Sequence, residues 1–420
     1  MSPRDAIDVA VVGAGPAGIA AAIAAARAGA RVVVVDRARF PRPKVCGGCL
    51  SPLGVSVVES LGAGRVLRDA VPLDAVRISC RGRTLRLRRA AGVAISRAEF
   101  DHALVGEARA LGVEVREGSI ARVTADERLE LRQSGGEATE SLAARVIVVA
   151  DGLSGGALDL HPTLASREDP ASRIGFGAIL PPGAAEVAPG EIHLVVHDGG
   201  YIGLVRLCDG SIDIAAAVDP STMRRLGGPA ACAARWLEAC RVDPAALASA
   251  RWLGTPRLTR RRVQTGLSRV LVAGDAAGYV EPFTGEGMGW AIAGGAAAGI
   301  RAARAARAEM QAEQNEHRAV PDDSIAARGE ALAARGEVLA AHGGALQRDR
   351  VDAGWDRELA QLTRVAKFRC AAVSRLMRRP TLVSALLAVG HTAPWPLEVL
   401  AGSIGRARAV LALPRGEVRA

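Results

Sequence analysis

The feature that most constrains this chain is a glycine-rich turn between a short apolar strand and a helix. Residues 7–12 (IDVAVV) predict a buried parallel strand, GAGPAG follows at 13–18, and an alanine-rich helical run comes next. A second apolar strand, RVVVVD at 31–36, ends in an acid. This is the G-x-G-x-x-G pattern in the strand–turn–helix context that holds the pyrophosphate of a dinucleotide at a helix N-terminus.

Each glycine of this motif has its own physical role. Gly13 permits the tight turn, Gly15 lets the backbone approach a pyrophosphate, and Gly18 allows close packing of helix and strand. Asp36 stands where an acid can bond a ribose hydroxyl, although this unit alone does not distinguish NAD from FAD. The residues predicted to bind the dinucleotide here are Gly13, Gly15, Pro16, Ala17, Gly18, Asp36 and Arg37.

Two distant segments favour FAD. RVIVVADGLS (145–154) and RVLVAGDAAG (269–278) each predict a buried strand followed by a turn of Asp and Gly, and TGEG (284–287) opens a helix of small residues. An NAD-binding site does not require a second such unit, whereas FAD is extended and needs protein groups at both its adenosine end and its flavin end. Asp275 would accept ribityl hydroxyls, and the TGEG amides would face the flavin. The residues predicted for this end are Gly274, Asp275, Gly285, Gly287 and Met288.

Taken together, these motifs resemble the superfamily of FAD enzymes that includes the aromatic hydroxylases and the geranylgeranyl reductases, over roughly residues 5–300. The resemblance implies an α/β fold: a Rossmann-type FAD-binding domain, an antiparallel substrate-side sheet and a helical C-terminal part. The expected divisions are 1–170 with 255–305 for the FAD-binding domain, 171–254 for the substrate-side sheet, and 306–420 for the helical region.

Further site residues follow from the same resemblance. Ser96 and Glu99 form a capping box at a helix start, and Arg97 between them would reach the phosphate or ribityl part of FAD, with a plain surface arginine as the alternative. KVCGGCLSP (44–52) resembles the Cys-Gly-Gly loop of the geranylgeranyl reductases, which implies that Cys46 lies beside the flavin as a catalytic residue. Cys49 is expected to be a buried small residue, with a redox pair as the alternative; zinc would need further ligands, and no metal is expected. The substrate pocket is predicted to include Tyr201, Pro282 and Phe283.

The reaction has two candidate forms on a hydrophobic small-molecule substrate. One is O₂-dependent hydroxylation of an aromatic or polyketide-like ring; the other is reduction of a carbon–carbon double bond in a prenyl lipid. Tyr201 is followed by IGLVR, without the Trp, Phe and Pro of the geranylgeranyl reductase motif, which favours hydroxylation, whereas the Cys-Gly-Gly loop favours reduction. We expect hydroxylation, with NADPH, NADH or another reductant as electron source. A non-catalytic lipid-escort protein is a third interpretation, and the intact flavin-end motifs weigh against it.

Composition limits the possible binding partners and the cellular compartment. The net charge is +10, but only Lys44 and Lys367 are lysines, and no helix-turn-helix, zinc-finger or RNA-binding motif is present, so no nucleic-acid partner is expected. An odd number of scattered cysteines, seven in all, favours a reducing compartment. The N-terminus leaves no room for a signal peptide, and no apolar run is long enough to span a bilayer. We expect a cytoplasmic protein; residues 380–405 are apolar enough to touch a membrane surface, although packing on the protein is favoured.

Overall fold

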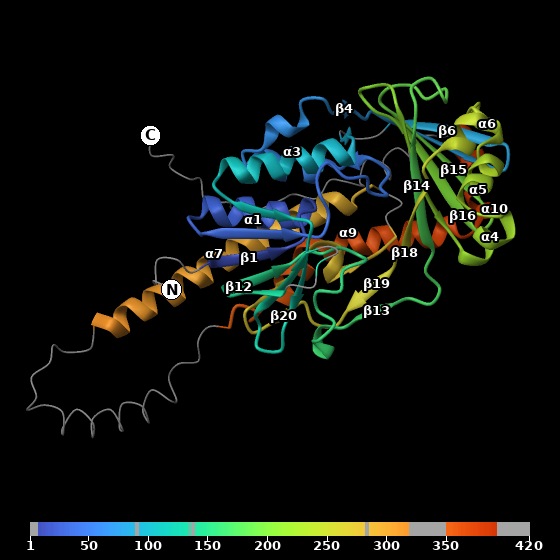
Figure 1. Ribbon diagram of the computed structural model, residues 1–420. Coiled ribbons are helices and arrows are strands. Elements are labelled where there is room, and N and C mark those ends of the chain that lie inside the picture. Colours follow the sequence, from blue (N-terminus) through green and yellow to red (C-terminus); the bar gives the residue numbers. More distant parts are fainter. Residues whose placement is uncertain are drawn as a thin grey trace, which may run out of the picture.

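The computed structural model describes residues 7–88, 92–133, 136, 139–281, 285–318 and 350–392. Two sheets dominate the structure. One is layered with helices and carries the predicted dinucleotide-binding turn, and the other stands beside it (Figure 1). Helices from the C-terminal third of the chain run along both. The expected α/β class, with an FAD-binding fold and a helical C-terminal part, is confirmed.

The first sheet has six strands in the order β20-β21-β12-β1-β2-β8. Its central strands are parallel and almost fully buried, which is why their sequences read as continuous apolar runs rather than alternating ones. The strands are β1 (Ile7–Val12), β2 (Val32–Asp36), β8 (Glu114–Glu117), β12 (Ala144–Val149), β20 (Gly266–Leu267) and β21 (Val270–Val272).

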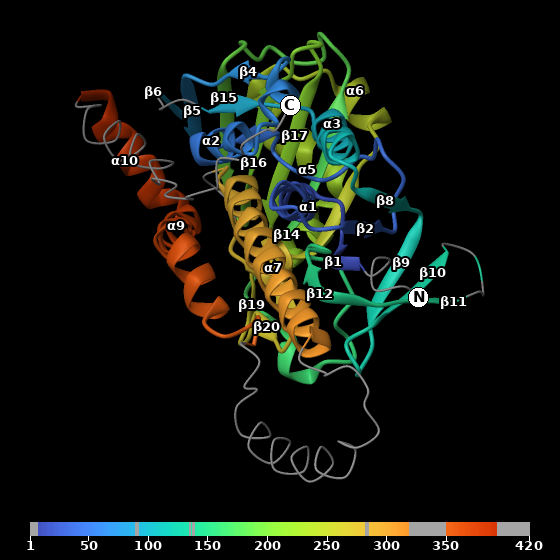
Figure 2. The ribbon, with the colours of Figure 1, turned by 90° about the vertical axis from the view of Figure 1, so that its left-hand side faces the viewer.

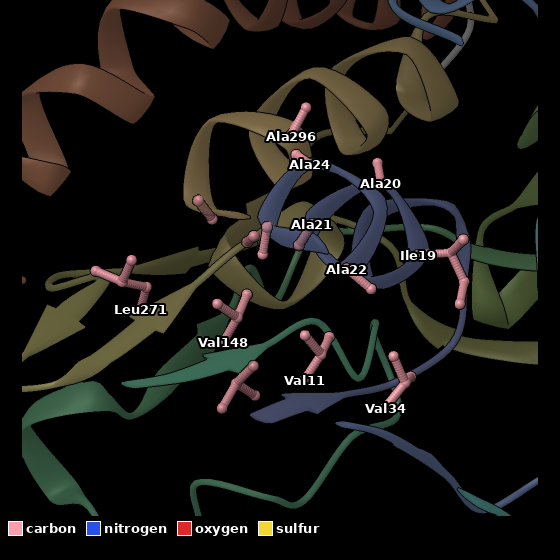
Figure 3. Packing of buried hydrophobic residues seen from close by; sticks show 14 of the residues in the cluster. Val11, Ile19, Ala20, Ala21, Ala22, Ala24, Val34, Val148, Leu271 and Ala296 are labelled. Atoms are coloured by element: carbon pink, nitrogen blue, oxygen red, sulfur yellow. The ribbon is translucent and has the colours of Figure 1, made fainter. Parts of the chain in front are cut away.

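Two helices cover one face of this sheet, α1 (Pro16–Arg27) and α7 (Gly287–Arg318). They touch through alanines and glycines, and Figure 3 shows Ala20, Ala21, Ala24 and Ala296 packed above the sheet valines. A side chain at Gly295 or Gly299 would collide with the backbone of α1. The helix α3 (Arg97–Ala110) also packs on α1, and the strands β9 (Ser119–Val123), β10 (Leu129–Gln133) and β11 (Thr139–Leu142) form a separate antiparallel sheet next to β2.

The second sheet has seven strands in the order β18-β14-β17-β16-β15-β5-β6. All neighbours are antiparallel except β15 and β5. The helices α4 (Pro220–Leu226), α5 (Pro229–Trp236) and α6 (Pro244–Ser249) cover its outer face (Figure 1). The strands are β5 (Ala75–Cys80), β6 (Arg83–Arg88), β14 (Ile174–Leu180), β15 (Glu191–His197), β16 (Gly200–Arg206), β17 (Ile212–Val218) and β18 (Leu253–Arg257).

The membership of β5 and β6 differs from the division drawn from the sequence, which put residues 1–170 in the FAD-binding domain. The hairpin that they form pairs through β5 with the open edge of β15, so an early segment extends the later sheet. Short strands form two further sheets of three strands each, and helix α2 (Pro52–Ser60) packs on α7. One sheet has β3 (Cys49–Leu50), β7 (Val93–Ala94) and β4 (Val71–Pro72), and the other has β13 (Ser166–Glu168), β19 (Arg260–Arg262) and β22 (Gly278–Tyr279).

The C-terminal helices α9 (Trp355–Met377) and α10 (Pro380–Thr392) run along the outside of both parts (Figure 2). Trp355 is fully buried and its Nε1 donates to the Val272 carbonyl at 3.1 Å, while Asp356 accepts from the Thr265 amide and hydroxyl at 2.6 Å each. These bonds attach α9 to the end of β21. Residues 319–349 and 393–420 of the predicted helical region (306–420), with the end of the apolar segment 380–405, lie outside the described residues. None of the described helices is long and apolar enough to cross a bilayer.

Candidate active site

A cavity of about 380 Å³ lies where the first sheet's parallel strands end and the inner face of the seven-stranded sheet begins. It joins residues from almost every motif in the sequence analysis, although they are separated by up to about two-thirds of the chain. The predicted residues that line it are Gly13, Gly15, Pro16, Ala17, Asp36, Cys46, Arg97, Tyr201, Asp275, Gly285, Gly287 and Met288.

Three other predicted residues lie behind or beside this wall. A side chain at Gly18 would strike the Gly13 carbonyl, and one at Gly274, where φ is +63°, would press on Ala17, so both glycines serve close packing. Arg37 is exposed and its Nη1 is 3.4 Å from the Ser154 carbonyl. The predicted pocket residues Pro282 and Phe283 lie outside the described part of the chain.

The N-terminus of α1 forms one end of the cavity. Gly15 is its N-cap, and no side chain among the described residues caps it, so the first-turn amides are open to the cavity. A methyl group at Gly15 would have only the Arg42 guanidinium near it, at 3.7 Å, and would therefore occupy the approach to these amides. Asp36 is held rigidly because its carboxylate accepts from the Ala14 amide at 2.6 Å and the Ala38 amide at 2.7 Å. This end fits an anionic pyrophosphate with an adjacent ribose.

Asp275 marks the other end. It follows β21, lines the cavity and is surrounded by cations: burial raises the pKa of its carboxyl, and Lys44, Arg97 and Lys367 oppose that rise. Lys367 comes from α9, and its Nζ donates to the Gly278 carbonyl at 3.1 Å. The two lysines of the chain thus stand near one carboxylate. The sequence analysis noted both lysines but assigned neither to the site, although their rarity among 54 basic residues was an available signal.

The two ends fit FAD. Open amides and a rigid acid suit its adenosine diphosphate half, and a carboxylate at the far end suits the ribityl hydroxyls. When bound, FAD would supply two-electron redox chemistry there. The residues that would hold it are those of the GAGPAG turn, Asp36, Arg97, Asp275 and the turn at 285–288.

Arg97 is positioned by a buried acid one helical turn away. Its Nε and Nη2 donate to the two Asp101 oxygens at 3.0 and 2.8 Å, and only 10% of its side chain is exposed. Arg97 is therefore a wall residue and not a surface arginine. It stands beside Cys46, and it opposes the effect of burial, which raises the pKa of the Cys46 thiol.

The loop that carries Cys46 also faces a buried carboxyl that the sequence analysis did not single out. Asp213 on β17 is 5% exposed, and burial raises its pKa to about 8 although the nearby Arg97 charge lowers it. A side chain at Gly48 would lie 2.7 Å from the Asp213 carboxylate, so the glycine lets the loop pass over it. Cys49 also lines the cavity, and its Sγ lies 3.0 Å from the Gly47 carbonyl oxygen. None of the seven cysteines, all of which lie in the described residues, forms a disulfide bond.

The wall from the seven-stranded sheet is apolar. Its residues there are glycine, alanine, leucine, isoleucine and proline, apart from Tyr201 and Thr255: Gly175, Ile192, Leu194, Gly203, Leu204, Ala215, Ala216, Ala217, Leu253, Gly254, Pro256 and Leu258. The Thr255 hydroxyl accepts from the Gly175 amide and donates to the Pro256 carbonyl, both at 2.8 Å. The Thr255 hydroxyl therefore already has hydrogen-bond partners within the protein.

Tyr201 is the exception in this wall. Its ring lies under the Arg173 guanidinium at 5.7 Å, and Arg173 is fully buried and paired with Glu281 at 3.0 Å. Burial and the Glu281 charge raise the pKa of the Tyr201 phenol well above its ordinary value, so it keeps its proton at neutral pH. The Arg173–Glu281 ion pair beside the ring fixes the position of this hydroxyl.

Comparison with known proteins agrees with this geometry. The family model described as FAD binding domain matches residues 6–194. A menaquinone reductase of Mycolicibacterium smegmatis is 30% identical over 314 residues, covering 68% of this chain and 73% of that protein. A menaquinone reductase of Mycobacterium tuberculosis is 52% identical over 79 residues, and the chain matches only 19% of its length. A 6-methylpretetramide 4-monooxygenase of Streptomyces rimosus is 41% identical over 80 residues, 19% of each chain.

Solved structures share the fold. A geranylgeranyl bacteriochlorophyll reductase-like protein of Thermoplasma acidophilum superposes with a TM-score of 0.64 at 16% identity, covering 88% of this chain and 87% of that one. A flavin-dependent brominase superposes with a TM-score of 0.68 at 14% identity and 95% coverage of both. The fold and site define an FAD-dependent oxidoreductase. The chain belongs to the family of FAD-binding flavoenzymes that contains the mycobacterial menaquinone reductases.

Proposed function

We propose that this oxidoreductase reduces a carbon–carbon double bond in a long hydrophobic molecule of the prenyl-lipid or prenyl-quinone class. The observation that carries the proposal is the substrate-side wall, whose described residues are apolar apart from Thr255, which is hydrogen-bonded within the protein, and Tyr201, whose phenol lies beside Glu281. Such a wall suits hydrocarbon and holds no charged group for a polar ring. The relationship to menaquinone reductases supports the same choice over the hydroxylation expected from the sequence.

The protein's own groups would supply a proton. Saturating a double bond adds two hydrogens, that is, two electrons and two protons. If both electrons and one proton come from the reduced cofactor, the other hydrogen arrives as a proton. Burial raises the pKa of both the Tyr201 phenol and the Cys46 thiol, and both side chains line the cavity with their protons in place. Arg173 and Glu281 would orient Tyr201, while Arg97 would orient Cys46. NADPH, NADH or another reductant would restore the reduced flavin.

Ring hydroxylation is the second candidate, because a stretch of the chain is similar to a monooxygenase. The two reactions differ in their need for O₂ and in the mass of the product. The FAD-loaded protein, reduced chemically under anaerobic conditions, should convert a prenylated quinone to a product that carries two additional hydrogens in its tail. Mass spectrometry identifies that product, and reoxidation of the flavin absorbance measures turnover.

Tyr201→Phe is the matched variant for this experiment. It should retain its FAD and lose most of the anaerobic turnover, because it keeps the ring and removes the hydroxyl. A product that gains one oxygen atom and forms only in air would refute the proposed reduction and establish hydroxylation.

A further inference from the structure

The charged side chains of the two C-terminal helices are all positive over most of their length. From Leu359 to Thr392 the chain has five arginines and Lys367 and not a single Asp or Glu. The whole protein, by contrast, has 44 acidic residues against 54 basic ones, so a stretch of this length without an acid departs from the rest of the chain. The segment is all helix apart from the short junction at 378–379.

The same helices expose large apolar side chains on one side. On α9 Val365 is 60% exposed and Phe368 is 71% exposed; on α10 Leu382 is 43% exposed and Val389 is 62% exposed. Val365 and Phe368 are three residues apart on α9, and Leu382 and Val389 are seven apart on α10, so each pair lies on one side of its helix. The opposite side of α9, including Leu359 and Met377, is buried against the protein. Other exposed large apolar residues in the described chain are scattered singly over different elements.

The arginines divide between the two sides. Arg378 turns inward and bonds the Ala171 carbonyl at 2.9 Å and Asp219 at 3.3 Å. Three others are exposed and have no side-chain hydrogen bond or ion pair with any described residue: Arg364, Arg375 and Arg379. Together with Val365, Phe368, Leu382 and Val389 they form what we term the α9–α10 outer face. Figure 2 shows α9 and α10 along the outside of the molecule.

We propose that the α9–α10 outer face rests on an anionic lipid bilayer. Exposed apolar side chains would enter the boundary between headgroups and acyl chains, and the three arginines would contact lipid phosphates. Neither helix meets the requirement for crossing a bilayer, so both would lie in the plane of the surface. An acid-free, arginine-bearing face is complementary to an anionic membrane and would be repelled by another copy of itself. The proposal does not depend on which reaction the cavity carries out.

Flotation of the FAD-loaded, full-length protein with vesicles tests this surface. The protein should float with phosphatidylcholine vesicles that contain phosphatidylglycerol and remain behind with phosphatidylcholine alone, and added salt should weaken the binding. The triple variant R364Q/R375Q/R379Q should lose about fivefold in affinity per arginine, on the order of a hundredfold in total. Phe368→Ser should weaken binding about tenfold, because it removes a ring that would leave water.

Matched controls stand on other elements. R122Q/R132Q/R167Q removes three exposed arginines of β9, β10 and β13, and Val263→Ser alters another exposed apolar residue, 75% exposed. Both controls should float like the unaltered protein. FAD absorbance reports whether each variant is folded, and turnover of detergent-dispersed substrate tests the proposed reaction separately. Absence of flotation with anionic vesicles, equal losses in the control variants, or a dimer in sedimentation that Phe368→Ser dissociates would each overturn the proposal.

Discussion

Replacement of Lys367 on α9 should change the pH dependence of FAD binding, because the Lys367 ammonium group favours the ionised form of Asp275. Asp275 must be ionised to accept charge-assisted hydrogen bonds from FAD, yet burial raises the pKa of its carboxyl. Lys367 is one of the cations that oppose this rise, and its own position is fixed by the Gly278 carbonyl. Lys367→Met keeps the length of the side chain and removes the charge.

The magnitude follows from the loss of one nearby cation. An opposite charge close to a carboxyl lowers its pKa, so the Asp275 pKa should rise further in the variant. Below that pKa Asp275 is protonated and loses charge-assisted hydrogen bonds of roughly 1.5–3 kcal/mol, which corresponds to about tenfold to a hundredfold in Kd. The affinity for FAD should therefore fall as the pH falls, with a midpoint at higher pH than in the unaltered protein.

Fluorescence titration of apoprotein with FAD over a pH series measures this shift. Lys367→Arg should restore the unaltered profile, and Arg364→Met, on the exposed side of α9, should leave it unchanged. In an Asp275→Asn background Lys367→Met should add little, since the group on which it acts is gone. The coupling would be refuted if Lys367→Met still weakened FAD binding by the same factor in the Asp275→Asn background. Parallel pH profiles for Lys367→Met and the unaltered protein would refute it as well.

Gly15→Val should fold but lose FAD binding, because its side chain would stand before the open amides of α1; titration with FAD at unaltered affinity would contradict the assignment of this turn. Cys46→Ser should keep its FAD and lose turnover, whereas Cys49→Ser should be mild, and equal, severe defects in steady-state kinetics would argue against Cys46 as the reactive wall residue. Native Asp213 keeps its proton up to about pH 8, while an unfolded carboxyl ionises near pH ~4, so this residue's contribution to stability is complete at low pH and is lost as the pH rises through that window. Asp213→Asn should therefore flatten the decline of the unfolding free energy in urea between these pH values, and an unchanged slope would exclude the effect.

The residues that sequence alone identified belong to continuous units with strong local rules. The GAGPAG turn, with Asp36 at the end of the next strand, is a strand–helix–strand unit whose parts are neighbours in the chain, and the structure has β1, α1 and β2 where the pattern predicts them. The capping box at Ser96 likewise specifies the start of α3, and the Ser96 side chain lies 3.4 Å from the Glu99 amide. Backbone conformation and apolar periodicity determine such units, and both are local properties.

Only the tertiary structure decided what surrounds the cavity. Asp213 stands beside Arg97 because β17 crosses the loop at Cys46, and no periodicity reports a contact between such distant segments. The same holds for the pairing of β5 with β15 and for the approach of Lys367 to Asp275 from the C-terminal helix. These contacts form because separate apolar faces bury one another, and the charges they bring together then shift each other's pKa values. Burial and electrostatics of this kind depend on the whole fold, which is why the sequence could locate the nucleotide cradle but not the acid, the lysine or the helix that complete the site.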